Sequence, residues 1–391
     1  MKHRIIFAAA LLFIVLARSV AAEKISTALR GVRKLEDIVI FEDAKFYAAF
    51  PSIVRRSDGE LLVAFRRAPE RRPFGQGISH TDPNSHLVLV RSRDGGRTWA
   101  REPELIYAHP FGGSQDPCMV QLRDATIICT SYAWMPLPAG AWARLKQPVA
   151  RAGEFAFLGG FVVRSMDGAH SWEPPIIPAP CRGEVNHDAF GHIIPAYNRG
   201  ALCEGKDGRL FWVVAASGTN AANHTGVHLL ISPDKGKTWD YSSVVAADPK
   251  IEFNETSICE TPKGDLVAFI RSEGFNDHTV IARSTDGGKT FEWRDGGFQG
   301  HPHFALRLPD ERMLLVYGYR HAPFGIRARV LNAECTDAST APEIVLRDDG
   351  GNGDLGYPWA AMVSADRALV VYYFNKADGT RHIAGTFLQI D

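Results

Sequence analysis

The chain has 391 residues, in which 44 lysines and arginines balance 44 aspartates and glutamates for a formal net charge of zero. Without a basic excess, the protein lacks the charge with which nucleic-acid-binding proteins neutralise phosphates. A composition of 45% hydrophobic and 23% charged residues excludes a disordered or fibrous chain, and 36 glycines with 23 prolines favour a turn-rich β protein.

Residues 1–22 have the pattern of a secretory signal peptide. A basic start precedes an apolar run over residues 5–17, and Val20-Ala21-Ala22 matches a small-residue cleavage site. The apolar run is shorter than the roughly 20 residues that a membrane-spanning helix needs. We therefore expect cleavage after residue 22 and a secreted or periplasmic protein with no membrane association in its mature form. Residues 23–391 are expected to form a single domain.

A turn followed by an apolar strand recurs six times along the chain. In the first copy, Asp58-Gly59 separates two apolar runs, which is a strong hairpin signal because glycine tolerates the positive φ of a tight turn. Copies about 60 residues apart suit a propeller in which each blade has four strands, so six hairpins predict six blades. The copies span residues 57–63, 123–128, 206–211, 262–267, 309–315 and 365–370.

A second repeat has the form Ser-x-Asp-x-Gly-x-Thr-Trp. Its aspartate can accept bonds from nearby backbone N–H groups, its glycine supplies the turn, and its aromatic residue packs beneath. These aspartates are therefore predicted to stabilise the fold and to take no part in the chemistry. The copies span residues 92–99, 165–172, 232–239 and 284–291.

Four copies at this spacing resemble the Asp-box (BNR) repeat of the sialidase superfamily, and the resemblance covers essentially the whole mature chain. It implies an all-β fold, a six-bladed β-propeller of four-stranded antiparallel blades, with the active site on the axis where the first strands converge. It also implies an exo-sialidase-like glycoside hydrolase that acts on a glycan or oligosaccharide through a tyrosine nucleophile, with retention of configuration.

About eight positions before each hairpin turn, strand starts would reach one rim of the central channel. Ala49 and Pro51 occupy this place before the first turn, and polar residues occupy it before the other five. A ring of convergent polar groups at such an axis is a ligand site by default. We expect a substrate-binding role for most of this set, which contains Asp116, Arg199, Glu255, His301, His303 and Tyr357.

The resemblance also assigns roles residue by residue. Tyr357, in a Gly-Tyr-Pro segment, corresponds to the nucleophile, Glu255 to its partner, and Asp82 to the acid/base residue. Arg271 and Arg320 correspond to the second and third arginines that bind the substrate carboxylate. A neutral tyrosine suits an anionic sugar, because a carboxylate nucleophile would be repelled, and nearby arginines would favour the phenolate.

One position departs from the family pattern. Ala49 stands where the first arginine of the triad is expected, and residues 370–374 lack the acid that would hold that arginine. A substrate carboxylate would then be bound differently, for example by Arg66, Arg67 or Arg199. Alternatively, the substrate is another sugar, such as a uronic acid or a neutral terminal residue.

Histidines widen the choice of chemistry. His86 lies near Asp82 in sequence and joins His301 and His303 as an expected substrate-binding residue. A histidine or tyrosine base would instead suit a polysaccharide lyase acting on uronate-containing glycans, and a non-catalytic glycan-binding propeller is a third reading. No cofactor or metal site is predicted.

Six cysteines permit disulfides in an exported chain without proving them. Cys118 and Cys129 flank a predicted turn almost symmetrically, so they could face each other across a hairpin. Cys203 and Cys259 occupy matching strand positions, which favours core packing. Buried free thiols are an equal expectation for most of the six.

Overall fold

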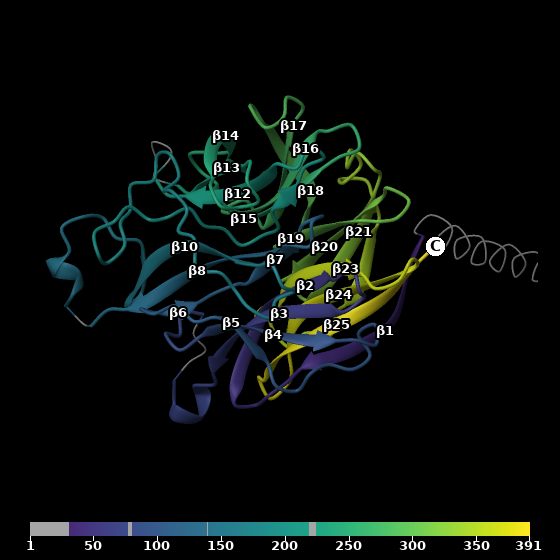
Figure 1. The fold of residues 1–391 in the computed structure, drawn as a ribbon, viewed down its shortest axis with the longest axis horizontal. Coiled ribbons are helices and arrows are strands. Elements are labelled where there is room, and N and C mark those ends of the chain that lie inside the picture. Colours follow the sequence, from purple (N-terminus) through teal and green to yellow (C-terminus); the bar gives the residue numbers. More distant parts are fainter. Residues whose placement is uncertain (1–30, 77–79, 139, 219–223) are drawn as a thin grey trace, which may run out of the picture.

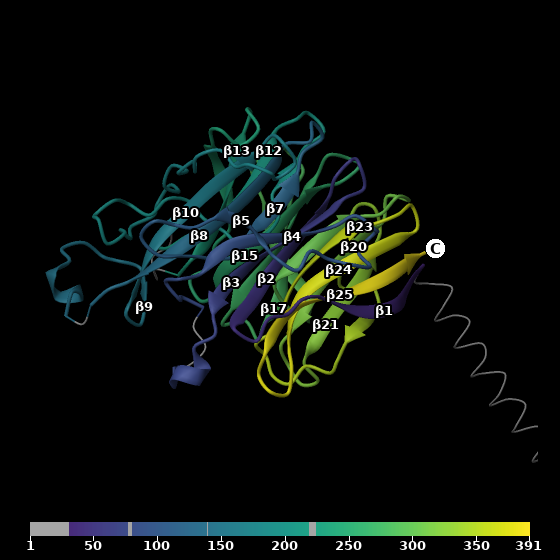
Figure 2. The same cartoon turned by 60° about the horizontal axis from the view of Figure 1, so that its bottom comes forward.

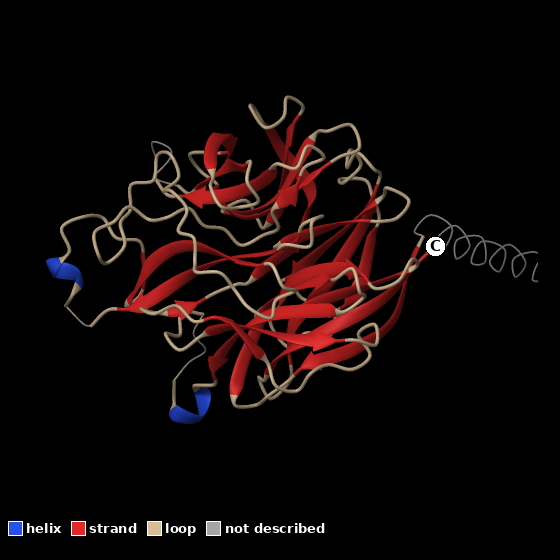
Figure 3. Ribbon diagram, in the orientation of Figure 1, coloured by secondary structure: helices blue, strands red, loops and turns tan. Residues whose placement is uncertain are grey.

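The computed structural model describes residues 31–76, 80–138, 140–218 and 224–391, so the expected signal peptide lies outside the described residues. Strands dominate this part of the chain, and two short 3-10 helices, Arg72–Phe74 and Trp142–Arg144, lie at the periphery (Figure 3). No helix among the described residues is both long and apolar enough to cross a bilayer.

The strands form six antiparallel sheets around one axis, which makes the protein a six-bladed β-propeller (Figure 1). Blades 1 and 2 contain β2 (Phe46–Arg55), β3 (Leu61–Pro69), β4 (His86–Ser92) and β5 (Glu104–Tyr107), then β6 (Gly113–Ser114), β7 (Cys118–Gln121), β8 (Ile127–Pro136), β9 (Arg151–Ala152) and β10 (Phe155–Ser165). Blades 3 and 4 contain β11 (Cys203–Glu204), β12 (Leu210–Ala216), β13 (Gly226–Ser232) and β14 (Asp240–Ala246), then β15 (Glu252–Glu260), β16 (Leu266–Glu273), β17 (His278–Ser284) and β18 (Glu292–Gln299). Blades 5 and 6 contain β19 (His303–Arg307), β20 (Met313–Tyr319), β21 (Gly325–Leu331) and β22 (Glu343–Arg347), then β23 (Gly356–Met362), β24 (Arg367–Asn375), β25 (Arg381–Ile390) and β1 (Val32–Phe41).

Blade 6 closes the ring with strands from both ends of the described chain. The N-terminal strand β1 pairs antiparallel with the C-terminal strand β25, from Val32 opposite Ile390 to Phe41 opposite Ile383 (Figure 2). This pairing leaves the propeller without an open junction between its first and last blades, because the closing sheet contains both chain ends.

Blade 2 departs from the regular four-stranded pattern. Two short strands, β6 and β7, take the place of one inner strand, and both pair with β8. On the outer side, β9 pairs with β10 over two residues, and Ile176 forms an isolated bridge to Val162. The break between β6 and β7 contains Asp116, so this blade presents a loop residue at the axis.

Both sequence repeats form the predicted elements. Each of the six hairpin turns connects the innermost strand of its blade to the next strand, and each Asp box connects the third strand to the outer edge. In the first box, Asp94 accepts the backbone N–H groups of Arg97 and Thr98 at 3.0 and 2.9 Å. The Thr98 hydroxyl and N–H hold the pKa of Asp94 well below its ordinary range. These aspartates are structural, as predicted.

Of the two alternatives for Cys118 and Cys129, the structure has free thiols that do not face each other. In the β7–β8 register, Cys118 lies opposite Thr130 and Cys129 opposite Met119, so the two thiols belong to opposite faces of the sheet. Cys118 packs in the apolar core near the axis, while Cys129 packs between blades 1 and 2. All six cysteines are free thiols in this structure.

Candidate active site at the propeller axis

The inner strands of blades 1, 4 and 6 each contain an irregularity near their start. The register shifts between Ala49 and Ser52 in β2, and at the corresponding place in β15 and β23. Bulges of this kind re-aim a side chain and are common beside active sites. Tyr357 lies within the β23 bulge at φ 53°, a conformation that costs a tyrosine about 1–3 kcal/mol unless its surroundings fix it.

The surroundings of Tyr357 provide these fixing contacts. Its phenolic Oη donates a hydrogen bond of 2.5 Å to Glu255 Oε1 on β15, and Arg271 Nη1 on β16 lies 3.0 Å from Glu255 Oε2. Burial raises the pKa of Tyr357 well above its ordinary value, and the charge of Glu255 adds to this effect. Burial also opposes ionisation of Glu255, but Arg271, Tyr357 and Arg320 outweigh it and lower the pKa of that carboxyl. The pair is therefore a neutral phenol bonded to a carboxylate.

Two arginines border this pair. Arg271 also contacts Glu273 Oε1 through Nη2 at 3.0 Å. The Arg320 guanidinium lies 5.0 Å from the centre of the Tyr357 ring and donates to Leu355 O at 3.2 Å and Tyr373 Oη at 3.4 Å. Both sequence-predicted arginines are thus beside the predicted nucleophile.

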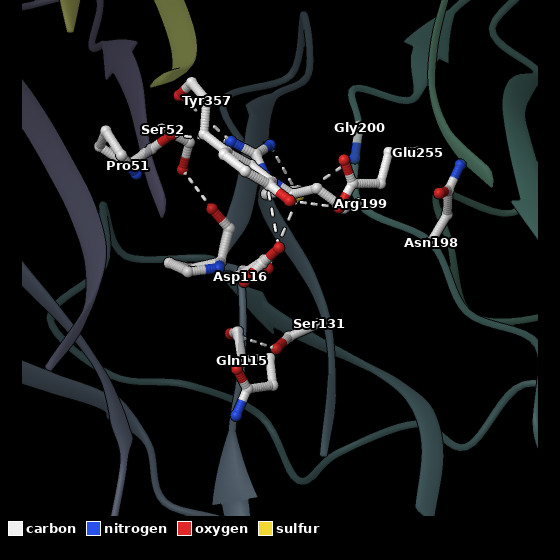
Figure 4. A network of polar contacts seen from close by, with 12 residues as sticks. Pro51, Ser52, Gln115, Asp116, Ser131, Asn198, Arg199, Gly200, Glu255 and Tyr357 are labelled. Atoms are coloured by element: carbon white, nitrogen blue, oxygen red, sulfur yellow. Dashed lines mark hydrogen bonds and ion pairs between the residues drawn. The ribbon is translucent and has the colours of Figure 1, made fainter. Parts of the chain in front are cut away.

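Arg199 lies at the centre of the axis, only 3% exposed, and connects four blades (Figure 4). Its Nη2 donates to the carbonyl oxygens of Pro51 and Tyr357 at 3.2 and 3.4 Å, and its guanidinium lies 5.1 Å from the Tyr357 ring centre. Its Nε is 3.7 Å from Asp116 Oδ2. Arg199 therefore contacts both the backbone carbonyl and the ring of Tyr357 from a buried position.

Asp116 is 1% exposed, and its carboxylate points toward Arg199 and Tyr357 (Figure 4). Oδ2 accepts the Tyr132 hydroxyl at 3.2 Å, whereas Oδ1 is buried with no hydrogen-bond partner in the described part of the chain. Burial raises the pKa of Asp116 to about 6, and the nearby charge of Glu255 adds to the rise while Arg199 opposes it.

Asp82 is separated from this group. Its Oδ2 accepts Arg71 Nε at 2.8 Å, and its Oδ1 accepts the Asn84 N–H at 2.8 Å and Arg71 Nη2 at 3.3 Å. Within the described ranges, no hydrogen bond or ion pair connects Asp82 to Tyr357 or Glu255. The Asp82 carboxylate interacts electrostatically with Arg66, which also interacts with Asp116.

The three predicted histidines have different positions. Burial lowers the pKa of His301 to about 2, and the charges of Arg271 and Arg320 add to this effect. His301 is therefore a neutral imidazole that borders the site. His303 instead faces the interface of blades 4 and 5, where its Nε2 lies 2.8 Å from Thr279 Oγ1. His86 starts β4, and no hydrogen bond, ion pair or ring contact between it and Tyr357 is present among the described residues.

The structure shows what lies beside Ala49. In the β2–β3 register Ala49 is opposite Arg66, so their side chains share one face of the sheet. Arg66 is fully buried, its guanidinium lies 5.6 Å from the Tyr47 ring centre, and its charge interacts with Asp116 and Asp82. A guanidinium from the neighbouring strand therefore lies beside the position where the family arginine is expected.

Sequence reasoning missed Asp354. This loop residue accepts the hydroxyls of Tyr47 and Tyr373 at 3.0 and 2.9 Å and Arg381 Nε at 2.9 Å. Tyr373 belongs to the segment that lacks the expected acid, so a carboxylate from another part of the chain lies next to that segment. No motif surrounds Asp354, and only the fold could place it there.

No group of three or more His, Cys, Asp or Glu side chains suited to holding a metal ion occurs among the described residues. A cavity of about 650 Å³ opens around the other ends of the inner strands and is lined by residues such as Met119, Ile258 and Phe304. Its lining includes Trp359, whose ring also lies 5.1 Å from the Arg199 guanidinium. This cavity contains none of the predicted site residues.

The profile of the BNR repeat-like domain matches residues 150–369 of this chain. The chain belongs to the BNR repeat-like family. A protein of unknown function from Dyadobacter fermentans, known from its crystal structure, is 59% identical in sequence to this BNR propeller. The match covers 92% of this chain and 100% of the Dyadobacter chain, with a TM-score of 0.90. No curated protein matches the chain.

Two more distant structures share the fold. The NanB sialidase of Streptococcus pneumoniae is 13% identical over 92% of this chain and 70% of its own, with a TM-score of 0.60. The Penicillium chrysogenum α-L-arabinanase, complexed with arabinobiose, is 12% identical over 92% of this chain and 99% of its own, with a TM-score of 0.63. The BNR propeller therefore has the sialidase-superfamily propeller fold that these structures share.

Proposed function

We propose that the protein is an exported glycoside hydrolase that removes a terminal sugar from a glycan, with retention of configuration and with Tyr357 as nucleophile. The observation that carries this proposal is the hydrogen bond of 2.5 Å from Tyr357 Oη to Glu255 Oε1, with Arg271 at 3.0 Å from the second oxygen of Glu255. A glycan-binding protein without catalysis has little need for a buried phenol bonded to a carboxylate.

The proposed chemistry follows from these groups. Tyr357 Oη attacks the anomeric carbon while its proton passes to Glu255, and a carboxylic acid protonates the departing oxygen. Arg271 and Arg320 stabilise negative charge that develops on the phenol oxygen. Water then attacks the anomeric carbon of the glycosyl-tyrosine and gives a proton to the carboxylate formed in the first step, while Tyr357 leaves and recovers its proton from Glu255. The family resemblance implies Asp82 as this acid, although both of its oxygens accept hydrogen bonds from Arg71.

The substitution of Ala49 for the first arginine of the triad bears on the substrate class. A sugar whose carboxylate is attached to the anomeric carbon would lack the arginine that Ala49 replaces. We therefore propose a terminal uronic acid or a neutral sugar ahead of sialic acid. Residues 23–391 are proposed to act as one exported domain.

A panel of aryl glycosides tests the proposal. The glycones are sialic acid, hexuronic acids, neutral hexoses and arabinofuranose, and the readout is release of the fluorescent phenol. We expect turnover of at least one glycone, a loss of at least about 10³-fold in Tyr357→Phe, and labelling of Tyr357 by the matching fluorinated glycosyl fluoride. Asp310→Asn, on the exposed turn of blade 5, is the matched control. Full activity of Tyr357→Phe would refute the nucleophile.

A lyase acting on uronate-containing glycans is the second candidate, because the neutral His301 lies beside Arg271 and Arg320. Arginines that neutralise a uronate carboxylate and a neutral imidazole are the groups needed to remove the proton next to that carboxylate. Uronate oligosaccharides distinguish the two candidates, since a lyase forms an unsaturated product with ultraviolet absorbance and a hydrolase does not.

A further inference from the structure

We infer that Asp116, rather than Asp82, donates the proton to the departing oxygen, an assignment that rests on the proposed function. Asp116 lies in the break between β6 and β7 of the irregular blade 2, on the axis with Tyr357. The reaction needs a carboxyl that carries a proton, points into the site and has an oxygen not committed to another residue.

Asp116 meets the geometric condition. Only Oδ2 is engaged, by the Tyr132 hydroxyl at 3.2 Å and by Arg199 Nε at 3.7 Å. Oδ1 is fully buried and has no hydrogen-bond partner in the described part of the chain. An unmet acceptor in a buried site is costly, and a proton on Oδ1 shared with a substrate oxygen would satisfy it.

Asp82 does not meet the same condition. Its two oxygens accept three bonds, two from Arg71 and one from the Asn84 N–H, at 2.8 to 3.3 Å. Protonating this carboxylate would break its ion pair with Arg71 at a buried position, so it is better suited to hold the loop that connects β3 and β4.

The electrostatics separate an acid from a base. Asp116 is faced by Arg66 from β3, Tyr132 from β8, Arg199 from the segment before β11, Glu255 from β15 and Tyr357 from β23. Burial raises the pKa of Asp116 to about 6, while three arginines lower the pKa of Glu255. Two carboxyls whose pKa values are pushed apart by their environments mark the acid and the base of a site.

The atoms balance in both steps. In the first, the bond from the anomeric carbon to Tyr357 Oη forms, the bond to the departing oxygen breaks, the Asp116 proton goes to that oxygen, and the phenolic proton goes to Glu255. In the second, water attacks the anomeric carbon, Asp116 accepts a proton from this water, and Tyr357 Oη leaves and is reprotonated by Glu255. The sum is a glycoside plus water giving a sugar plus an alcohol.

Leaving-group dependence tests the assignment, because a good leaving group needs no proton. With the glycone found in the panel, kcat/KM is measured for the 2,4-dinitrophenyl and phenyl glycosides in wild type, Asp116→Asn and Asp82→Asn. We expect Asp116→Asn to lose at least about 100-fold on the phenyl glycoside and less than about tenfold on the dinitrophenyl glycoside. Asp82→Asn is expected to lose equally on both. Equal losses in Asp116→Asn, or unequal losses in Asp82→Asn, would overturn the assignment while leaving Tyr357 in place.

Tyr132→Phe provides a second readout that a structural role would not move. The substitution removes a hydrogen-bond donor to the Asp116 carboxylate, and losing this bond favours the protonated form of Asp116. The alkaline limb of the kcat/KM profile should therefore shift from near pH 6 to higher pH. An unshifted limb contradicts the role of Asp116. If wild type hydrolyses no glycoside of the panel, the proposed function and this assignment fall together.

Discussion

The buried cation Arg199 gives the most demanding test of how this axis is held together. Replacing Arg199 with methionine keeps much of the side-chain volume and removes the bonds to Pro51 O, Tyr357 O and Cys118 Sγ at 3.2 to 3.4 Å. It also leaves Asp116 without its cation. Removing one member of a buried ion pair costs about 3–5 kcal/mol, so we expect a loss of about 4 kcal/mol in the free energy of unfolding.

The assay is urea unfolding followed by tryptophan fluorescence, with equal m-values required for the comparison. Because the pKa of Asp116 in the fold, about 6, lies above its unfolded value, this group stabilises the protein at low pH, and that contribution is lost as the pH rises through about 6. In Arg199→Met the ionised Asp116 carboxylate has lost its cation, so the variant suffers more than the wild type when this group ionises. The difference in unfolding free energy between wild type and Arg199→Met should therefore grow from about pH 5 to about pH 8. Adding Asp116→Asn removes the uncompensated charge and should recover part of the loss at the higher pH. A deficit below about 1 kcal/mol, or strict additivity of the two changes, would refute the reasoning.

Three further outcomes are expected. Asp94→Ala removes the acceptor of an Asp box and should lower the unfolding free energy by about 1 kcal/mol in urea without changing kcat/KM; a change in kcat/KM would contradict its structural role. Gly113→Ala would place a Cβ 1.9 Å from Asp82 O, so thermal unfolding should show a loss of about 1–3 kcal/mol, and a neutral effect would contradict this contact. Tyr373→Phe removes a hydroxyl that accepts from Arg320, and steady-state kinetics should show KM raised by about tenfold with kcat little changed; a fall in kcat alone would contradict a binding role.

The fold could be predicted from sequence because its signals are local and repeated. Asp58-Gly59 and its five counterparts define the hairpins, and the Asp boxes define the turns to the outer strands. The position eight residues before each turn also placed Tyr357, Glu255 and Arg199 on the axis, since the inner strands of a propeller converge at one rim.

The contacts that sequence reasoning could not place depend on register or on loops. Cys118 and Cys129 looked symmetric about a turn, but a one-residue offset in an antiparallel pair sends side chains to opposite faces. His303 and His301 are two residues apart, yet one packs between blades and the other borders Arg271. Asp354 lies in a loop with no pattern around it, so its contacts appear only once β23 and β24 are built.

The arginines at the axis bear on which sugar the site accepts. Arg66 lies opposite Ala49, but the carboxylates of Asp82 and Asp116 interact with its charge and it is fully buried. Arg271 is paired with Glu255 at 3.0 Å, whereas Arg320 donates to neutral oxygens, one from a backbone carbonyl and one from a tyrosine. A substrate carboxylate would therefore find one guanidinium, that of Arg320, whose bonds are to neutral groups. A complete arginine triad would present three guanidinium groups to it. Because a bidentate arginine–carboxylate contact supplies much of the recognition of such an anion, turnover of sialosides is expected to fall below that of neutral sugars.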